Sequence, residues 1–397
     1  MNLYGARYDS HILHQIVSLE LRAHNVNAAV TLPRDLPQIW SLLARGAFGT
    51  TPQQVRRLAD SLAEKTGVEA ASIHQTAQGL VIVLAKPIAL RRALTPDFLL
   101  RSVVAAQRTL SPLAVPVGLS ILGEPVLLDL ADPSSPHAAI LGATGSGKSE
   151  LGRWLMWWLA LRNGPAVRLV TYSPKRDHDE LHGLAALAHP PLRSISEARR
   201  LLAWLINELD RRMQSGESNP PIVALFDEVP LLIKYAPEAD AMLDSIAAAG
   251  RGVGIHLVLT SQQATKDKAS AAMDNMPARL VGRVASGTLA YVTSGKSGTE
   301  ADKLLGRGDF YLVRHNAVRI QAPLLQADDW RRLTYGDQAE LDMPVAIEIE
   351  PRRGGSGWNA ADVDEAAVRA AFAAGAGVRE VMAEYSIGYS RAKRLQD

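Results

Sequence analysis

Short apolar runs alternate with helical patterns between residues 113 and 325 of this chain. The runs AAILGA, VRLVTY, IVALFD and IHLVLTS contain few polar positions, which is typical of strands that are buried on both faces. Helical patterns separate them, beginning at Lys148 and at Ser196, with a third from Ala239 to Ala249. This alternation predicts an α/β domain over residues 113–335, in which helices cover both faces of a parallel sheet.

Residues 1–112 contain a different pattern. Between Thr51 and Pro87, the helical pattern TPQQVRRLADSLAEKTG precedes two runs of strand type, VEAASIHQ and GLVIVLAKP. Together they predict a small α+β module. The preceding segment PRDLPQIWSLLARG, at residues 33–46, is interpreted as helical and carries no identifiable chemistry.

The last part of the chain predicts a linker and a separate helical module. Residues 336–360 include the run PRRGGSGW, whose Gly, Ser and Pro content is typical of a flexible linker. In residues 361–397, the segments VDEAAVRAAFAAG, GVREVMAEYS and GYSRAKRLQD predict three short helices. Their length and spacing outline a helix-turn-helix.

Composition narrows the possible chemistry. A formal net charge of +2 means that attraction to nucleic acid has to come from local basic patches. The chain has no cysteine, which excludes disulfides, thiolate zinc sites and thiol catalysis. The pairs His11 with His14 and His178 with His182 have a spacing that could bind a metal, but they lack the glutamate of a zinc-protease motif. We expect solvated or capping roles for them.

The hydrophobic runs are too short for a membrane span. The most apolar stretch, Trp154 to Leu161, lies between two arginines and is far shorter than the ~20 residues that cross a bilayer. The first residues, MNLYGARYDSHILHQ, are polar where a signal peptide would be apolar. We therefore expect a soluble cytoplasmic protein without a membrane anchor.

One motif predicts a nucleotide site. Residues 142–149, GATGSGKS, match the phosphate-binding pattern G-x-x-x-x-G-K-[ST] in full, between a predicted strand and a predicted helix. Backbone N–H groups at the start of a helix favour phosphate oxygens. Lys148 is predicted to reach the β and γ phosphates of ATP, and Ser149 to bind Mg²⁺. The residues predicted to hold ATP are Gly142, Ala143, Thr144, Gly145, Ser146, Gly147, Lys148, Ser149 and Asp227.

Polar side chains follow two further predicted strands. The run IVALF ends in Asp227 and Glu228, where Asp227 is expected to hold Mg²⁺ and Glu228 to polarise the attacking water. The strand from Ile255 to Thr260 runs into Gln262, whose amide is expected to sense the γ phosphate. The sequence thus predicts an ATPase.

Between residues 116 and 325 the sequence also resembles the FtsK/SpoIIIE family. The approach to the phosphate loop, GLSILGEPV and then DLAD, is similar to the family's stretch. Further resemblances are SISEARRLLAWLINELDRRMQ, AAAGRGVGIHLVLTSQQ, MPARL and LLGRGDFYL, in the family's order and spacing. The resemblance implies a RecA-like P-loop motor that uses ATP and Mg²⁺ to pump double-stranded DNA through a homo-oligomeric ring, expected to be a hexamer.

The resemblance also implies roles for particular arginines and lysines. Arg279 matches the arginine that completes the ATP site of a neighbouring subunit, with Arg251 as a second candidate. The family's Arg-Pro after the glutamine is replaced by Gln263 and Ala264, and its later DNA-binding run by SGTLAY. We therefore expect DNA contacts from lysines on pore loops, namely Lys266, Lys268, Lys296 and Lys303.

The end of the chain resembles the family's winged-helix domain. In YSIGYSRAKRLQD, the residues Arg391, Lys393 and Arg394 place basic groups on the last predicted helix, where they would contact DNA. The chain ends at Asp397, before the position of a wing. The module between Thr51 and Pro87 is similar in pattern to the family domain that sits on the motor.

Three other functions fit parts of this pattern. A conjugative or mobile-element DNA pump is the nearest alternative, and a protein-secretion ATPase of the same family is more distant. A DNA-binding scaffold switched by ATP is a third, but the intact Lys148, Asp227 and Glu228 argue against an inactive site.

Overall fold

The computed structural model describes residues 8–46, 51–106, 110–262, 271–274, 276–327, 329 and 369. The chain divides into two compact units, residues 1–347 and 348–397. The linker at residues 336–360 and the helix-turn-helix at residues 361–397 lie outside the described residues, apart from Arg369. The domain boundaries drawn from the sequence stay predictions.

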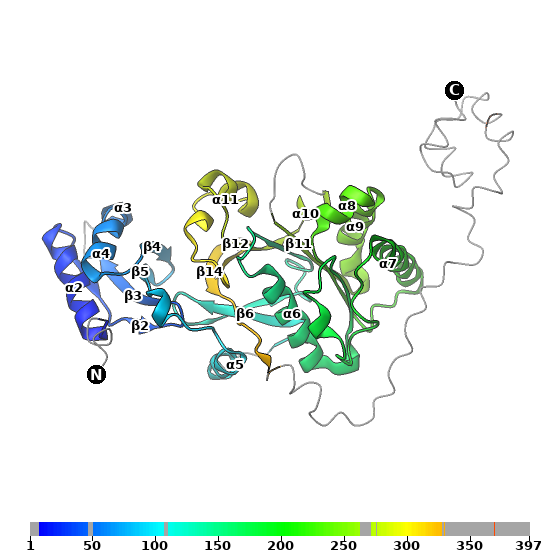
Figure 1. The fold of residues 1–397 in the computed structure, drawn as a ribbon, viewed down its shortest axis with the longest axis horizontal. Helices are drawn as coiled ribbons and strands as arrows, with labels where there is room; N and C mark the ends of the chain where they lie inside the picture. The colour runs from blue at the N-terminus through cyan, green and yellow to red at the C-terminus, as the bar shows by residue number, and fades with distance from the viewer. Residues whose placement is uncertain are drawn as a thin grey trace. The chain divides into compact units, whose positions relative to one another are not determined.

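A small antiparallel sheet with three helices forms the N-terminal module, which is blue in Figure 1. The strand order is β1-β3-β5-β4, and β2 pairs with β3. The strands are β1 (Ala28–Val30), β2 (Arg34–Asp35), β3 (Ile39–Gly46), β4 (Ala71–Thr76) and β5 (Gly79–Ala85). The helices are α2 (Ser10–Ala23), α3 (Pro52–Arg56) and α4 (Ala59–Thr66). The α+β pattern expected between Thr51 and Pro87 is thus present, with its single expected helix divided into α3 and α4.

The helical interpretation of residues 33–46 is wrong, because this segment forms β2 and β3. Trp40 and Leu42 pack into the core under the helices, whereas Ile39 and Leu43 pack on the opposite face of the sheet. A strand buried on both faces has no polar alternation, so its apolar run looks the same as part of a buried helix. Antiparallel pairing with β5 decides between the two, and it outweighs the helical propensity of Leu and Ala.

The larger sheet carries the phosphate loop and has the order β7-β6-β14-β13-β12-β8-β11-β10-β9. The strands β12, β8, β11, β10 and β9 are parallel, as expected. The strands β13, β14, β6 and β7 join antiparallel, so the sheet is mixed and not wholly parallel. The bounds are β6 (Ala114–Ser120), β7 (Pro125–Asp129), β8 (Ala138–Leu141), β9 (Arg168–Tyr172), β10 (Ile222–Phe226), β11 (Ile255–Ser261), β12 (Ala278–Gly282), β13 (Asp309–Val313) and β14 (Ala317–Gln321).

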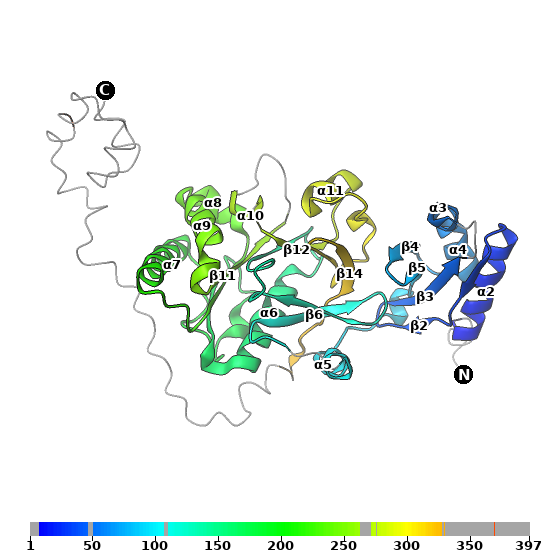
Figure 2. The ribbon, with the colours of Figure 1, turned by 180° about the vertical axis from the view of Figure 1, so that it is seen from behind.

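Helices cover this sheet on both faces, as Figures 1 and 2 show from opposite sides. In β8, Ala138 and Ile140 pack against α6 (Lys148–Asn163), and Ala139 and Leu141 pack into the other core, with α7 (Ile195–Ser215) and α9 (Glu238–Ala249). This two-residue alternation is what a strand between two layers requires. The remaining helices are α5 (Pro96–Ala105), α8 (Val229–Tyr235), α10 (Ala271–Asp274), α11 (Gly287–Ser294) and the 3₁₀ turns η1 (Ile88–Leu90), η2 (Gly164–Ala166), η3 (Asp179–Leu181), η4 (Gly250–Val253) and η5 (Ala301–Lys303).

Helix α6 is largely buried, and its buried apolar side chains all lie in the core on one face of the sheet. The indole N–H groups of Trp154 and Trp158 donate to the carbonyls of Pro116 and Ala114, each at 2.8 Å. Buried indoles of this kind contribute apolar area and still satisfy their polar atom. These contacts fix α6, and with it the phosphate loop, against β6.

In the part of the chain that the structure describes, no helix is both long enough and apolar enough to cross a membrane.

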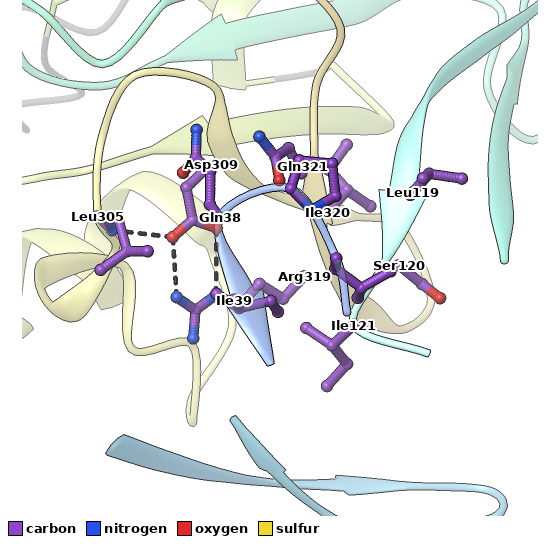
Figure 3. Close-up of a pocket in the computed structure, with 12 residues that line it drawn as sticks. Gln38, Ile39, Leu119, Ser120, Ile121, Leu305, Asp309, Arg319, Ile320 and Gln321 are labelled. Atoms are coloured by element: carbon purple, nitrogen blue, oxygen red, sulfur yellow. Dashed lines mark hydrogen bonds and ion pairs between the residues drawn. The ribbon is translucent and has the colours of Figure 1, made fainter. Parts of the chain in front are cut away.

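A small pocket marks the contact of the N-terminal module with the larger sheet (Figure 3). Gln38 and Ile39 line it from the module, and Asp309 and Arg319 from strands β13 and β14. The side-chain amide of Gln38 donates to the carbonyl of Arg307 at 3.0 Å. The turn that contains Arg307 also contacts the phosphate loop, so it lies between the module and the candidate site.

Candidate nucleotide site

Three parallel strands bring their carboxyl ends to one edge of the sheet. Strand β11 pairs with β8 on one side and with β10 on the other. The phosphate loop follows β8, Asp227 and Glu228 follow β10, and Gln262 follows β11. Ligands of open α/β sheets bind at this edge. The structure therefore brings together the residues that the sequence predicts for binding and hydrolysing ATP.

The phosphate loop has the backbone of a phosphate-binding turn. Gly147 has φ +105° at the start of α6, and a Cβ there would lie 2.9 Å from the nitrogen of Gly308. Gly142 has φ +147°, and a Cβ there would lie 2.9 Å from Ser146 Oγ. Both positions require glycine because L side chains rarely adopt this backbone and no room is left for them.

Neighbouring backbone holds the loop in place. The N–H of Ala143 donates to the carbonyl of Arg283 at 2.7 Å. On the other side, the N–H of Gly308 donates to the backbone carbonyl of Ser146 at 2.9 Å, and the N–H of Arg307 donates to the carbonyl of Gly145 at 3.3 Å. The hydroxyl of Ser146 is buried and has no hydrogen-bond partner among the described residues. A buried polar atom of this kind fits a site that receives a polar ligand.

Lys148 is held inside the loop. Its Nζ donates to the carbonyls of Gly142 at 2.8 Å and Ala143 at 3.2 Å. Burial lowers the pKa of Lys148, while the carboxylates of Glu228 and Asp227 act in the opposite direction. A phosphate group would supply the negative charge that this partly desolvated ammonium lacks.

Asp227 is the buried member of the acidic pair. Its Oδ2 accepts from Ser173 Oγ at 2.9 Å, and its Oδ1 accepts from the hydroxyl of Thr260. These bonds hold the carboxylate at the end of β10. Together with the Ser149 hydroxyl it offers the oxygen ligands that Mg²⁺ prefers, so the residues fit the predicted metal.

Glu228 has an unusual backbone and a fixed carboxylate. Its φ is +54°, which is uncommon for a residue other than glycine and occurs often at functional sites. Its Oε1 accepts from Lys175 Nζ at 2.8 Å and from Gln262 Nε2 at 2.7 Å. Burial raises the pKa of Glu228, but these two hydrogen bonds and the charges of Lys175 and Lys148 outweigh it and lower the pKa overall. An ionised carboxylate is the form that a general base needs.

Gln262 links the acidic pair with the phosphate loop. In addition to its bond to Glu228, its Oε1 lies 3.5 Å from the hydroxyl of Thr144, which donates to it. This position, between the loop and Glu228, agrees with the sensing role that the sequence predicts. The role itself stays a prediction.

Sequence reasoning missed the segment after β9. Lys175 forms an ion pair with Glu228 at 2.8 Å, and Asp177 Oδ2 accepts from Ser149 Oγ at 3.0 Å. The signal was present, because SPKRD places polar residues directly after the buried strand RLVTY. Since β9 pairs in parallel with β10, its carboxyl end lies at the same edge of the sheet.

Arg279 and Arg251 lie away from this chain's phosphate loop. Arg279 pairs with Ala139 near the start of β12 and donates to the carbonyl of Thr293 at 3.3 Å. Arg251 lies in η4, before β11, and donates to the carbonyl of Pro133 at 3.3 Å. Both arginines thus lie toward the amino ends of parallel strands, whereas the loop follows the carboxyl end of β8.

The residues predicted to bind DNA are only partly described. Lys296 is half-buried, and its Nζ donates to the carbonyl of His315. Lys303 forms an ion pair with Glu300 at 2.7 Å. The other predicted contacts, Lys266, Lys268, Arg391, Lys393 and Arg394, lie outside the described residues.

The histidine pairs gather no metal-binding group. His14 Nε2 lies 3.0 Å from the carbonyl of Val30. His178 is buried at the start of η3, with Nδ1 2.5 Å from Thr171 Oγ1, and burial lowers the pKa of His178 to about 4. Within the described ranges, no three His, Asp or Glu side chains lie together in a way that could hold a metal ion.

Comparison with solved structures supports the fold. The cytoplasmic domain of the Thermomonospora curvata type VII secretion ATPase EccC superposes with a TM-score of 0.54 at 23% identity, over 66% of this chain and 36% of that one. The pCW3 conjugation coupling protein TcpA, solved with ATPγS, superposes with a TM-score of 0.53 at 17% identity, over 81% of this chain and 98% of that one. The described α/β domain therefore has a P-loop ATPase fold.

Comparison with known sequences shows similarity to one family of ATPases. Residues 101–217 match the model of the FtsK/SpoIIIE family. The DNA translocase SftA of Bacillus subtilis (strain 168) is 26% identical over 96% of this chain and 43% of its own length. The DNA translocase FtsK of Lactiplantibacillus plantarum is 26% identical over 91% of this chain and 50% of its own length. The chain spans half or less of the length of these relatives, and it is similar to the FtsK/SpoIIIE family over residues 101–217.

Proposed function

We propose that this chain is an ATPase motor that moves double-stranded DNA. The observation that carries the proposal is the meeting of the phosphate loop, the acidic pair and Gln262 at one sheet edge, with Gln262 bonded to Glu228 at 2.7 Å. The relatives named DNA translocases supply the substrate class. ATP and DNA meet in the cytoplasm, which is where we expect the chain to act.

In this proposal, different residues of the site bind the phosphates, accept the proton of the attacking water and sense the γ phosphate. Backbone N–H groups of the loop and Lys148 bind the phosphates, which positions the γ phosphate. Glu228 accepts a proton from the attacking water, and Gln262 responds to the presence of the γ phosphate. Ser149 and Asp227 would hold Mg²⁺, which would neutralise charge that develops on the phosphate oxygens.

A ring explains the position of Arg279. This residue cannot be assigned to its own chain's site, because it lies near the start of β12 while the phosphate loop follows the end of the adjacent β8. An arginine supplied by a neighbouring subunit stabilises the charge that develops during transfer. We propose that Arg279 serves the next subunit of a homo-oligomer, a hexamer in our proposal.

DNA contacts in this proposal come from basic side chains on loops and on the C-terminal module. Lys266, Lys268 and Lys296 would follow the phosphate backbone without reading sequence. Lys296 would exchange its bond to the His315 carbonyl for a DNA phosphate. The last predicted helix would contact a DNA groove, through Arg391, Lys393 and Arg394.

The test is an ATPase assay of the full chain with and without linear duplex DNA. We expect turnover that depends on Mg²⁺ and rises several-fold with duplex DNA. Single-stranded DNA and an unfolded polypeptide are the comparison substrates. Stimulation by single-stranded DNA alone would favour a conjugative pump, and stimulation by polypeptide alone would favour a secretion motor. Failure to hydrolyse ATP under all these conditions would contradict the proposal.

A further inference from the structure

Three alternate residues of the segment after β9 each contact a different residue of the ATP site. Ser173 donates to Asp227 at 2.9 Å, and Lys175 donates to Glu228 at 2.8 Å. Asp177 accepts from Ser149 at 3.0 Å. The parallel pairing of Tyr172 with Phe226 explains the arrangement, because the residues after β9 and β10 then leave the sheet side by side.

Within this segment Lys175 reaches the residue on which hydrolysis depends. Glu228 has a side chain that is 12% exposed, whereas Lys175 is 50% exposed. The lysine therefore extends from the solvent side to an enclosed carboxylate. An ion pair this accessible contributes little to stability, with typical values of about 0–1 kcal/mol. The position of Lys175 beside Glu228 therefore points to a role in catalysis and not in stability.

Both side-chain donors contact the same oxygen of Glu228. Lys175 Nζ and Gln262 Nε2 lie 2.8 Å and 2.7 Å from Oε1. The backbone N–H of Glu228 donates to Thr260 Oγ1 at 3.1 Å and fixes the other end of the residue. None of the described residues donates a hydrogen bond to Oε2. The carboxylate is thus held by one oxygen, and the second oxygen is left to act on a water molecule.

We propose that Lys175 is a positioning residue for ATP hydrolysis: it holds Oε1 of Glu228 so that Oε2 is directed at the attacking water. The inference rests on the proposed ATPase function and deepens it. A base must be held close to its reacting geometry, since a displacement of about 1 Å can cost about 100-fold in rate. Gln262 alone would restrain Oε1 from one side, and it is also the residue expected to move when the γ phosphate leaves.

Direct phosphate binding by Lys175 would make a different prediction. A half-exposed lysine beside a phosphate loop could bind the phosphates directly, as Lys148 is proposed to do. Loss of a phosphate ligand weakens nucleotide binding, whereas loss of a positioning residue lowers kcat and leaves binding nearly intact.

The experiment measures steady-state ATPase kinetics of the full chain with Lys175→Met and Lys175→Arg. For Lys175→Met, we expect kcat to fall about 10- to 100-fold, while KM and the affinity for a non-hydrolysable ATP analogue stay within about threefold. Lys175→Arg keeps a cationic donor and should recover kcat to within about fivefold of wild type. Lys234→Met, at an exposed lysine on α8 whose Nζ lies over the Tyr235 ring, is the matched control and should behave as wild type.

A double variant tests whether Lys175 acts through Glu228. In a Glu228→Gln background, Lys175→Met should lower the residual turnover less than twofold, because effects of residues that act as a unit are not additive. An unchanged kcat in Lys175→Met, a raised kcat, or a tenfold rise in KM with kcat unchanged would each overturn the positioning role while leaving the ATPase function intact. If the wild type itself had no turnover, the proposed function would fail, and this inference with it. Equal melting temperatures of Lys175→Met and wild type establish that the variant is folded, and Lys175→Gln replaces it if they differ.

Discussion

Arg319 and Asp309 form an ion pair between the adjacent strands β14 and β13, with Nη2 and Oδ2 2.8 Å apart and both side chains less than 8% exposed. Figure 3 shows the pair beside Gln38 and Ile39 of the N-terminal module. Asp309 also accepts from the N–H of Leu305. Arg319 extends the network into the module, where its Nη1 lies 3.0 Å from Ser72 Oγ and 3.1 Å from His74 Nε2.

Removal of Arg319 alone should destabilise the protein strongly. Arg319→Met leaves the Asp309 carboxylate buried without its cation, and breaking a buried pair in this way costs about 3–5 kcal/mol. Chemical denaturation followed by circular dichroism measures the loss. Arg92→Met is the control, since the pair of Arg92 with Asp35 is exposed and should contribute less than about 1 kcal/mol. Similar losses of unfolding free energy in the two variants would show that the buried ion pair contributes no more to stability than the exposed one.

His74 should make stability sensitive to acid. Burial, followed by the positive charges of Arg319, Arg56 and Lys303, lowers the pKa of His74 from 6.5 to about 3. Between these values the unfolded chain binds the proton and the folded one does not. This contribution to stability is therefore complete above pH 6.5 and is lost as the pH falls from 6.5 towards 3.

The His74→Gln variant isolates this effect, because its side-chain carbonyl can still accept from Arg319. Between pH 7.5 and pH 5, the wild type should lose about 2 kcal/mol more stability than the variant, and its Tm should fall by about 4–8 °C more. Other buried histidines are common to both proteins and cancel in the difference. Parallel Tm curves for the two proteins would rule out the titration of His74.

Two substitutions should separate binding from hydrolysis. Lys148→Ala removes the cation that contacts the phosphates and should abolish turnover, whereas Glu228→Gln should keep nucleotide bound and lower kcat about 100-fold or more. Filter binding with radiolabelled ATP, together with phosphate release, distinguishes the two. Turnover at the wild-type rate in Glu228→Gln would show that another group is the base.

Arg279 should act across a subunit interface. Arg279→Ala should lower turnover of the assembled protein while leaving ATP binding to isolated subunits nearly intact, because the residue contacts a neighbour's nucleotide. Mixing Arg279→Ala with Lys148→Ala subunits should restore part of the activity at interfaces where an intact loop meets an intact arginine. No recovery at any mixing ratio would place the arginine's role within its own chain.

DNA binding should depend steeply on salt and little on sequence. Each lysine that neutralises a phosphate contributes about 0.9 to the slope of log K against log salt concentration. The double variant Lys266→Ala with Lys268→Ala should therefore reduce the slope by up to about 2. Fluorescence anisotropy with duplexes of unrelated sequence measures both properties. A slope unchanged from wild type would exclude these lysines from the DNA contact.

The hydrophobic pattern of the sequence predicted the strands that are buried on both faces. The strands β8 to β11 contain few polar residues because layers of side chains cover both of their faces, and this pattern is visible in the residues alone. Residues 33–46 show the limit of the same reasoning. The run IWSLLA is apolar apart from Ser41, and only pairing with β5 makes it a strand. The antiparallel half of the large sheet was likewise not predicted, because strand direction depends on which neighbours meet.

The sequence by itself determined the parts of the site that are local in the chain. The phosphate loop, the acidic pair after IVALF and the glutamine after IHLVLTS each lie next to the strand that presents them, so their residue types and spacing record their chemistry. Only the tertiary structure joined Lys175 to Glu228, across 53 residues, and Arg319 to His74, across 245. Such contacts leave no period or motif in the chain, because they arise when paired strands bring distant segments to the same edge of a sheet.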